Sequence, residues 1–338
     1  MTHEFKTLVD TAYAWQSNGA KVLLATVVKL EGSSYRRPGV RMIISNAGEM
    51  KGALSGGCVE KEVLRQAQSV FKDGIPKVMT YDGRFRLGCE GMLYILLEPI
   101  HLSEKVYQTL QNQFKERKSF TCESYFQVQE SESQSMGSVI TIEGAAYVLN
   151  SSFSIKNVER LQKFTQKYDP IFQLYIFGAE HDAVQLCRMA HHIGWEVHII
   201  APPDEEKTID YFEGATTLTT PLLNSIDTSG MDKNTAVMLM SHSLHKDVQY
   251  LLALKDVNPT YIGLLGPKHR RERLFSEFLN VYPETPYEFF ETIHGPAGID
   301  IGAESASEIA VSIFAEILSV VRKSALQPLR DKSGSIHE

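Results

Sequence analysis

The sequence lacks a large excess of either charge, closely spaced cysteines and long hydrophobic runs. Its 338 residues carry a formal net charge of −7, which gives no electrostatic reason to expect nucleic acid or an anionic membrane as a partner. Its four cysteines form no C-x-x-C pair, which excludes a disulfide framework and a zinc ribbon and is typical of a reducing compartment. No apolar run approaches the roughly 20 residues of a membrane span, and the first residues lack a signal-peptide pattern. These absences predict a cytoplasmic protein.

Two patterns of secondary structure divide the chain. In the first part, strand-like runs such as 21–30 and 91–100 alternate with glycine-rich joints and helices, which predicts an α+β domain. From Ile171 onward, apolar strands alternate with helices, which predicts a Rossmann-like, doubly wound parallel sheet. The segment 157–170 is interpreted as a connector. The chain is therefore predicted to be an α/β protein with an N-terminal α+β domain over 1–160, a Rossmann-like domain over 161–325 and a polar tail over 326–338. Four strands are expected in the Rossmann-like domain, at 171–178, 196–202, 235–242 and 261–266.

The glycine-rich joints of the first domain hold its candidate chemistry. The run Ser55-Gly56-Gly57-Cys58 opens a helix, so inward-pointing backbone N–H groups and the positive helix end favour an anion. The helix start also favours the thiolate of Cys58, which makes it a candidate nucleophile or soft-metal ligand. Glu60, in the same turn, is within reach of a bound polar group. The alternative is a tight turn that contains a small buried cysteine.

Two further joints strengthen the functional interpretation. Arg36 and Arg37 lie on a glycine-rich loop and suit bidentate contacts to a phosphate or a pterin carbonyl. A solvated basic loop is the alternative. Cys89 lies in a second Gly-Cys joint just before a strand, and both cysteines are candidates for one shared cleft.

Several motifs carry a family resemblance that spans nearly the whole chain outside 101–170. The N-terminal motifs are EGSSYRRPGVRM, GALSGGCVE and LGCEG, and the C-terminal ones are LYIFGAEHDA, YIGLLGPKHRRERL and IHGPAGIDIGAESASEIAVSIFAEI. In order and spacing these motifs resemble the XdhC/CoxI family, the accessory (maturation) proteins of xanthine dehydrogenase.

This resemblance implies a chaperone for the molybdenum cofactor, the molybdopterin form. Such a protein holds the cofactor while a cysteine desulfurase supplies the terminal sulfur. It then delivers the cofactor to an apo xanthine dehydrogenase-type molybdenum hydroxylase. A homodimer is left open. The motifs assign cofactor binding to Arg36, Arg37, Ser55, Gly56, Gly57, Cys58, Glu60 and Cys89, with Cys58 and Cys89 nearest the molybdenum. One departure is Glu90, which stands where the family commonly has glycine.

The second domain carries an incomplete dinucleotide fingerprint. Gly178 and Ala183 satisfy the first and third small positions, but Glu180 replaces the glycine that should approach the pyrophosphate. A carboxylate about 4 Å from a phosphate repels it by about 4 kcal/mol at an effective dielectric near 20. The acidic residue that should bind the ribose is also replaced, by Ala201 and Pro202. The pattern predicts a Rossmann frame without conventional NAD(P) binding.

Two rival functions remain. One is a Rossmann-type NAD(P)-dependent oxidoreductase, which the fingerprint disfavours. The other is a metal-binding scaffold, in which Glu180 and the strand-end histidines His181, His242 and His294 bind a divalent metal. Histidines that simply satisfy hydrogen bonds are the alternative to such a site. A complete xanthine dehydrogenase is excluded, because the chain is too short and lacks an iron–sulfur cysteine pattern. An accessory chaperone is favoured over an enzyme.

Overall fold

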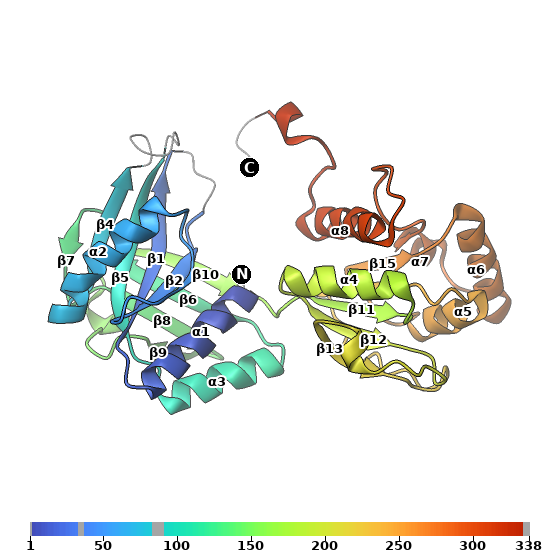
Figure 1. Cartoon of the computed structure of the whole chain (residues 1–338), viewed down its shortest axis with the longest axis horizontal. Coiled ribbons are helices and arrows are strands. Elements are labelled where there is room, and N and C mark those ends of the chain that lie inside the picture. Colours follow the sequence, from blue (N-terminus) through green and yellow to red (C-terminus); the bar gives the residue numbers. More distant parts are fainter. Residues whose placement is uncertain (1, 33–36, 83–90, 334–338) are drawn as a thin grey trace. The chain divides into compact units, whose positions relative to one another are not determined.

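The computed structural model describes residues 2–32, 37–82 and 91–333, and the chain divides into two compact units (Figure 1). The first unit runs to Pro170, and the second runs from Ile171 to Asp331. The boundary predicted from the sequence lies at residue 160, because 157–170 is interpreted there as a connector. Strand β10 (Gln162–Tyr168) instead pairs along its whole length with β6 (Phe120–Phe126), so it belongs to the first unit. None of the helices in the described ranges is long and apolar enough to cross a membrane.

The first unit combines two antiparallel sheets with three α-helices. One sheet has six strands in the order β3-β2-β1-β5-β4-β7, and the other has four in the order β10-β6-β8-β9. Its elements are α1 (Thr2–Ser17), β1 (Val22–Glu31), β2 (Arg41–Ser45), β3 (Met50–Gly52), α2 (Cys58–Asp73), β4 (Lys77–Asp82), β5 (Met92–Ile100), α3 (Glu104–Lys115), β6, β7 (Ser131–Glu132), β8 (Gly137–Ile142), β9 (Ala145–Val148), a 3-10 helix η2 (Ile155–Asn157) and β10.

The central strands of the six-stranded sheet are buried on both faces. Successive side chains of a strand point to opposite faces. Leu24 of β1 and Ile43 of β2 therefore join a core cluster with α1, whereas Leu23 and Met42 join a different cluster with α2. Burial on both faces explains why β1 and β2 are nearly continuous apolar runs rather than alternating ones.

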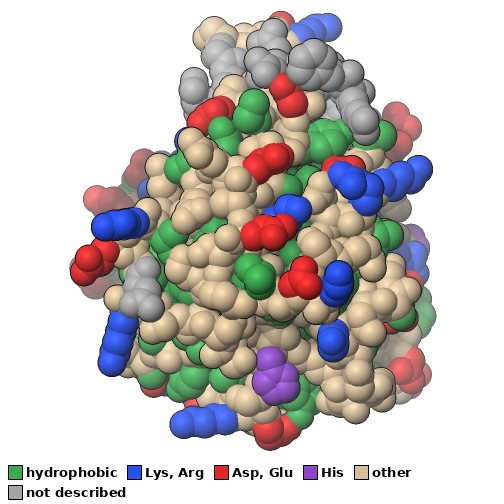
Figure 2. Space-filling model, turned by 90° about the vertical axis from the view of Figure 1, so that its left-hand side faces the viewer, with side chains coloured by type: hydrophobic (Ala, Val, Ile, Leu, Met, Phe, Trp, Pro, Cys, Tyr) green, Lys and Arg blue, Asp and Glu red, His purple; other side chains and the backbone are tan. Residues whose placement is uncertain are grey.

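The face of the first unit seen in Figure 2 has no grouping of charge by sign. Lysine and arginine side chains lie among aspartate and glutamate side chains over this face. Such mixing is typical of a solvated protein surface.

The second unit is built on a parallel sheet of six strands in the order β13-β12-β11-β14-β15-β16. Counted from β11, this is the 3-2-1-4-5-6 order of a dinucleotide-binding fold. The predicted fold class is confirmed. The elements are β11 (Gln173–Phe177), α4 (His181–His192), β12 (Glu196–Ile200), a 3-10 helix η3 (Ile209–Tyr211), β13 (Ala215–Thr219), β14 (Thr235–Leu239), α5 (Leu244–Ala253), β15 (Tyr261–Leu264), α6 (Lys268–Val281), α7 (Tyr287–Glu291), β16 (Ile293–His294), α8 (Ala306–Arg322) and a 3-10 helix η4 (Leu329–Asp331).

Two strands of this sheet, β13 and β16, go beyond the four that the sequence predicts. Both lie at the sheet edges, where β13 is partly exposed and β16 has only two residues. Neither carries the apolar run that marks a buried parallel strand. Helices α4 and α8 pack together in one core cluster of this unit, and α5 and α6 pack together in another (Figure 1).

Candidate functional site

The Ser55–Cys58 turn presents an exposed thiol at the start of α2. Cys58 is the first residue of the helix and is exposed, whereas Cys122 and Cys187 are buried. The preceding Gly57 has φ 50°, which favours glycine, and no side chain caps the helix start through a hydrogen bond. A Cβ added at Gly56 or Gly57 would meet nothing within 4 Å among the described atoms. The turn is therefore open, as an approach to the thiol requires, and it is not the tight turn around a buried cysteine that was the alternative.

Glu60 lies inside this turn rather than facing outward. Its side chain is buried, and its Oε1 accepts hydrogen bonds from the backbone N–H groups of Leu54 (2.9 Å) and Ser55 (2.8 Å). Its Oε2 is buried without a hydrogen-bond partner among the described residues. A carboxylate therefore takes two of the amides that lead into the Ser55–Cys58 turn. Glu60 holds the shape of the turn, and the expectation that it reaches outward to a bound polar group does not match this position.

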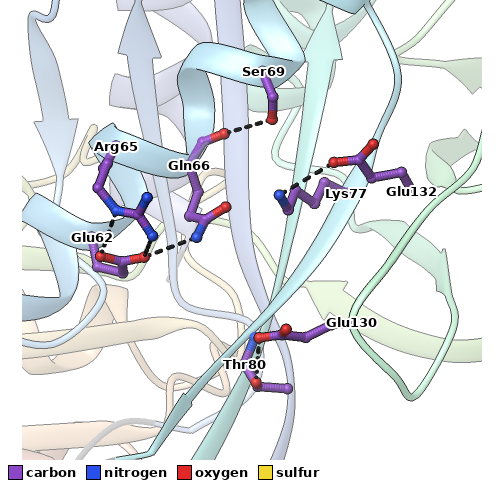
Figure 3. Close-up of polar contacts among 8 residues, drawn as sticks. All are labelled: Glu62, Arg65, Gln66, Ser69, Lys77, Thr80, Glu130 and Glu132. Atoms are coloured by element: carbon purple, nitrogen blue, oxygen red, sulfur yellow. Dashed lines mark hydrogen bonds and ion pairs between the residues drawn. The ribbon is translucent and has the colours of Figure 1, made fainter.

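On the next turns of α2, the charged side chains of Glu62 and Arg65 pair with each other. Glu62 accepts hydrogen bonds from Arg65 at 2.5 and 3.0 Å and from the Gln66 amide at 2.9 Å (Figure 3). The Glu62 carboxylate raises the pKa of Arg65. A residue three positions on lies on the same helix face, so this pairing follows from the helix itself. Arg65 is thus an exposed arginine that is already paired with a carboxylate.

The arginine loop is only partly described. Arg36 and Cys89, both predicted site residues, lie outside the described residues. Arg37 is exposed and lines a cavity of about 580 Å³ in the first unit. The same cavity is lined by Arg41, which is buried at the start of β2. Arg41 is not among the residues predicted from the sequence, although the loop motif contains it. The signal was a third arginine directly before the apolar run Met42–Ile44.

In the second unit, the first glycine of the fingerprint meets its structural requirement. Gly178 follows β11 with φ 142°, and a Cβ there would lie 2.5 Å from the carbonyl oxygen of Met240. Strands β11 and β14 meet at this point, where the strand order reverses, which is where folds of this kind place ligands.

Glu180 is the N-cap residue of α4, but its side chain makes no capping hydrogen bond. It is exposed, so it does not itself fill the anion site of the helix. Its negative charge helps to raise the pKa of Lys207. Burial works to lower the pKa of Lys207, but the carboxylates of Glu205 and Glu180 outweigh burial and raise it. The Glu180 carboxylate therefore acts on Lys207, a residue that the sequence motifs did not indicate.

Two of the strand-end histidines lie near the start of α4. His181 is exposed as the first residue of that helix. His242 has φ 56°, and its Nε2 lies 3.3 Å from the half-buried Asp182 carboxylate. The carboxylate of Asp247, which is buried, already accepts from the Ser241 hydroxyl at 2.6 Å and from Arg270 at 2.6 Å.

His294 is the last residue of β16, so it lies at a carboxyl strand end as predicted. It pairs with Gly263, one residue before the end of β15. Strand β16 is three strand positions from β11, which corresponds to roughly 14 Å at about 4.8 Å per strand. His294 pairs through Nδ1 with Glu316 of α8 at 3.1 Å, and Glu316 also accepts from Tyr261 at 2.6 Å. Burial alone would raise the pKa of Glu316, but these hydrogen bonds lower it. His294 therefore tethers α8 to the sheet.

The described residues contain no preformed set of metal ligands. Among residues 2–32, 37–82 and 91–333, no group of three or more His, Cys, Asp and Glu side chains is arranged to bind a metal ion. A cavity of about 1040 Å³ does exist in the second unit. Its lining includes Lys233 and Thr260, which precede β14 and β15, so it opens at the amino ends of the strands. It is thus separate from the point at Gly178 where the strand order reverses.

Comparisons with known proteins agree with this two-part architecture. The model described as the XdhC and CoxI family matches residues 15–82, and the model described as the XdhC Rossmann domain matches residues 174–317. A Bacillus subtilis (strain 168) protein described as a probable xanthine dehydrogenase subunit is 27% identical over 95% of this chain and 99% of its own length. The molybdenum cofactor insertion chaperone PaoD of Escherichia coli (strain K12) is 24% identical over 95% of this chain and 90% of its own length.

A solved structure supports the same fold. The crystal structure of a Bacillus halodurans protein described as a xanthine dehydrogenase superposes with a TM-score of 0.77 at 24% identity. It covers 97% of this chain and 99% of that chain. The two family models match separate segments, one within each compact unit. The chain therefore belongs to the XdhC and CoxI family.

Proposed function

We propose that this protein is a molybdenum cofactor chaperone. It binds the molybdopterin form of the cofactor, protects it while a cysteine desulfurase supplies the terminal sulfur, and delivers it to an apo xanthine dehydrogenase-type molybdenum hydroxylase. The cofactor is cargo in this role, so turnover of a substrate by the chain itself is not required. Membership of the XdhC and CoxI family and the whole-length similarity to an insertion chaperone support the proposal.

The observation that carries the proposal is the exposed Cys58 thiol at the uncapped start of α2. Thiolates are soft ligands that suit a soft, sulfur-bound metal centre. Glu60 holds the preceding turn through the amides of Leu54 and Ser55, which fixes where the thiol is presented. Cys58 would lie nearest the molybdenum or the sulfur, and we assign Cys89 and Arg36 supporting roles on the family motif alone.

The test is retention of the cofactor during purification. The full chain is produced in a molybdenum-sufficient host and purified, and its bound pterin is released by oxidation and measured by fluorescence. The wild type should carry pterin, and Cys58→Ala should carry several-fold less. Cys187→Ala, which removes a buried thiol from the other unit, should carry the wild-type amount. Absence of pterin from the wild type, under conditions where a known carrier retains it, would contradict the proposal.

A second measurement examines the role of Glu60. Glu60→Gln keeps one oxygen that can accept the hydrogen bonds from Leu54 and Ser55, whereas Glu60→Ala leaves both amides without that partner. Losing a buried hydrogen-bond acceptor costs about 1–3 kcal/mol. If Glu60 shapes the turn, pterin retention should survive in Glu60→Gln and fall in Glu60→Ala. Equal loss in both variants would instead favour direct contact between the carboxylate and the cargo.

One observation favours a different function. The 3-2-1-4-5-6 strand order and the positive φ of Gly178 belong to a dinucleotide-binding frame, as an NAD(P)-dependent oxidoreductase would need. Glu180 opposes the pyrophosphate in that cleft, and Ala201 and Pro202 offer no ribose-binding carboxylate. We therefore expect no saturable NADH binding at micromolar concentration. Binding of that strength, measured by fluorescence titration, would reverse this choice.

A further inference from the structure

The cavity of about 580 Å³ in the first unit has a buried arginine in its wall. It is lined by residues of α1, by the segments that lead into β2 and out of β3, and by Gln166 and Tyr168 of β10. This volume is in the range of roughly 300–1,000 Å³ that is typical of small-molecule sites. Parts of the chain more than 120 residues apart therefore meet around this cavity, since Arg41 contacts both Gln166 and Tyr168.

Arg41 is a buried cation whose hydrogen-bond partners are all uncharged. Its side chain donates to the carbonyl oxygen of Gly39 (3.1 Å), to the Gln166 amide oxygen, to the Tyr168 hydroxyl and to the Cys122 sulfur (3.4 Å). Its Nε is buried and has no hydrogen-bond partner, and Arg41 forms no ion pair within the described part of the chain. A buried charge without a paired counter-charge is costly, so an anion that enters the cavity would relieve that cost.

Glu98, the buried carboxyl that acts on Arg41, does not neutralise the arginine. Glu98 is fully buried, and burial raises its pKa to about 7 against the opposing effects of Ser138 and Arg41. Both of its oxygens are already engaged by the backbone and the hydroxyl of Ser138. Near neutral pH this carboxyl is only partly ionised. Arg41 therefore keeps positive charge that the protein interior does not neutralise.

The cavity as a whole is cationic. Arg37 and Lys51 are exposed at its wall, and with Arg41 they make three cations against the single carboxylate of Glu4. His3 also lines the cavity, but burial lowers its pKa, so it adds little charge at neutral pH. The net charge of the lining is therefore about +2, from three cations less one carboxylate. A phosphate monoester, which carries a charge of about −2 when fully ionised, matches it better than a monocarboxylate does.

Two glycines make this arrangement possible. Gly39 has φ 101°, and a Cβ there would lie 2.9 Å from the Gln166 amide oxygen that accepts from Arg41. Gly52 has φ 85°, and a Cβ there would lie 2.8 Å from the carbonyl oxygen of Arg41. Side chains at either position would press on the groups that hold the arginine in place. Gly39 and Gly52 thus leave the space that the Arg41 side chain and backbone occupy at the cavity wall.

We infer that this cavity binds a phosphate monoester, with Arg41 as its buried anchor and Arg37 and Lys51 as cations at its wall. The inference rests on the proposed function in one respect: it identifies the phosphate as that of the pterin cofactor. Ala53, which lines the cavity, is only five residues from Cys58, so the two lie at most about 18 Å apart along an extended chain. One ligand that carries a phosphate at one end and a metal at the other can engage both.

The test measures binding of phenyl phosphate to the full chain by calorimetry, with benzoate as the monocarboxylate of matching ring size. Phenyl phosphate should bind more weakly as salt increases, and benzoate should bind at least tenfold more weakly at about equal salt, because it matches only half of the charge. Arg41→Gln should weaken phenyl phosphate binding by more than about tenfold, as expected for loss of a charged hydrogen-bonding group. Arg41→Lys, which keeps the charge without the planar fork, should fall in between.

Further variants keep the test decisive if Arg41→Gln fails to fold. Arg37→Gln and Lys51→Gln alter exposed side chains and should each weaken binding about two- to fivefold. Arg65→Gln, the same change at an exposed arginine of α2 paired to Glu62, should have no effect. Wild-type affinity in both Arg37→Gln and Lys51→Gln, or equal binding of benzoate and phenyl phosphate, would overturn the inference.

Failure of the inference and failure of the proposed function can be told apart. Cys58→Ala should leave phenyl phosphate affinity unchanged, because the thiol is outside the cavity lining. If phenyl phosphate binds as expected but no pterin is retained, the phosphate site stands and the chaperone proposal fails. If folded Arg41→Gln retains as much pterin as the wild type, the assignment of the pterin phosphate to this cavity is wrong.

Discussion

The buried carboxyl of Glu98 predicts a specific loss of stability as pH rises. Glu98 is fully buried on β5, and burial raises its pKa from 4.5 to about 7. Between these two values the folded state binds the proton more tightly than the unfolded state. Stability must therefore fall as pH increases through this window. Replacement by glutamine, which resembles the protonated acid, should remove this dependence.

The magnitude follows from the pKa difference. A shift of one unit corresponds to about 1.4 kcal/mol, so a rise from 4.5 to about 7 is worth about 3 kcal/mol when fully expressed. Between about pH 5 and 8 most of this is realised, so Glu98→Gln should gain roughly 2–3 kcal/mol of stability relative to the wild type. Glutamine keeps an oxygen that accepts from the Ser138 N–H, and its amide can donate to the Ser138 hydroxyl. At about pH 5 the two proteins should be nearly equal in stability.

The assay is urea unfolding monitored by tryptophan fluorescence. The chain has two tryptophans, Trp15 in the first unit and Trp195 in the second. A Trp195→Phe background therefore leaves Trp15, which packs against the core of the first unit, as the reporter of the unit that contains Glu98. At high pH the urea midpoint of Glu98→Gln should exceed that of the wild type by on the order of 1 M.

A second carboxylate provides a control of opposite sign. Hydrogen bonding to Lys163 lowers the pKa of Glu123, so its contribution to stability is present at high pH and lost as pH falls. Glu123→Gln should therefore lose stability relative to the wild type as pH rises, where Glu98→Gln gains it. If the difference between Glu98→Gln and the wild type does not change with pH, the reasoning about Glu98 is refuted.

Two further predictions concern reactivity and backbone strain. Iodoacetamide should label Cys58 in the native chain and spare Cys122 and Cys187, because both are buried and burial raises the pKa of both thiols, that of Cys187 to about 12. Peptide mass spectrometry checks this, and native labelling of Cys122 at the rate of Cys58 would contradict it. Gly178→Ala should cost on the order of 3 kcal/mol, because its Cβ would lie 2.5 Å from the Met240 carbonyl oxygen. A thermal melt measures this, and an unchanged melting temperature would refute the assigned backbone conformation.

Local patterns predicted much of the fold. The strand expected at 21–30 is β1 (Val22–Glu31), and the alternation of apolar strands with helices predicted the parallel sheet of the second unit. These succeed because burial on both faces of a sheet leaves a continuous apolar run that is visible in one segment. Strand β10 was missed because its side chains are mostly exposed, so nothing in its own sequence marks it as part of a sheet. Pairing with β6 alone makes it a strand.

The candidate site divides in the same way. The exposed Cys58, the open Gly56-Gly57 turn and the helix start are all local features, so the motif indicated them. Glu60 was misjudged because the direction of a buried side chain depends on which backbone amides fold back towards it. His294 does lie at the end of its strand, but the strand order separates β16 from β11 by three positions, which no single segment reveals.

The sequence by itself determined the class of the second unit, the open turn at Cys58 and the carboxylate that replaces the second fingerprint glycine. Each of these is visible from the order of residues along the chain, without contacts between distant segments. Tertiary structure alone decided that Arg41 is buried beside Gln166 and Tyr168, which lie 125 and 127 positions further along the chain. A cavity and its charge arise from such distant segments, because pairing of strands across long sequence separations leaves no periodic trace in any single segment.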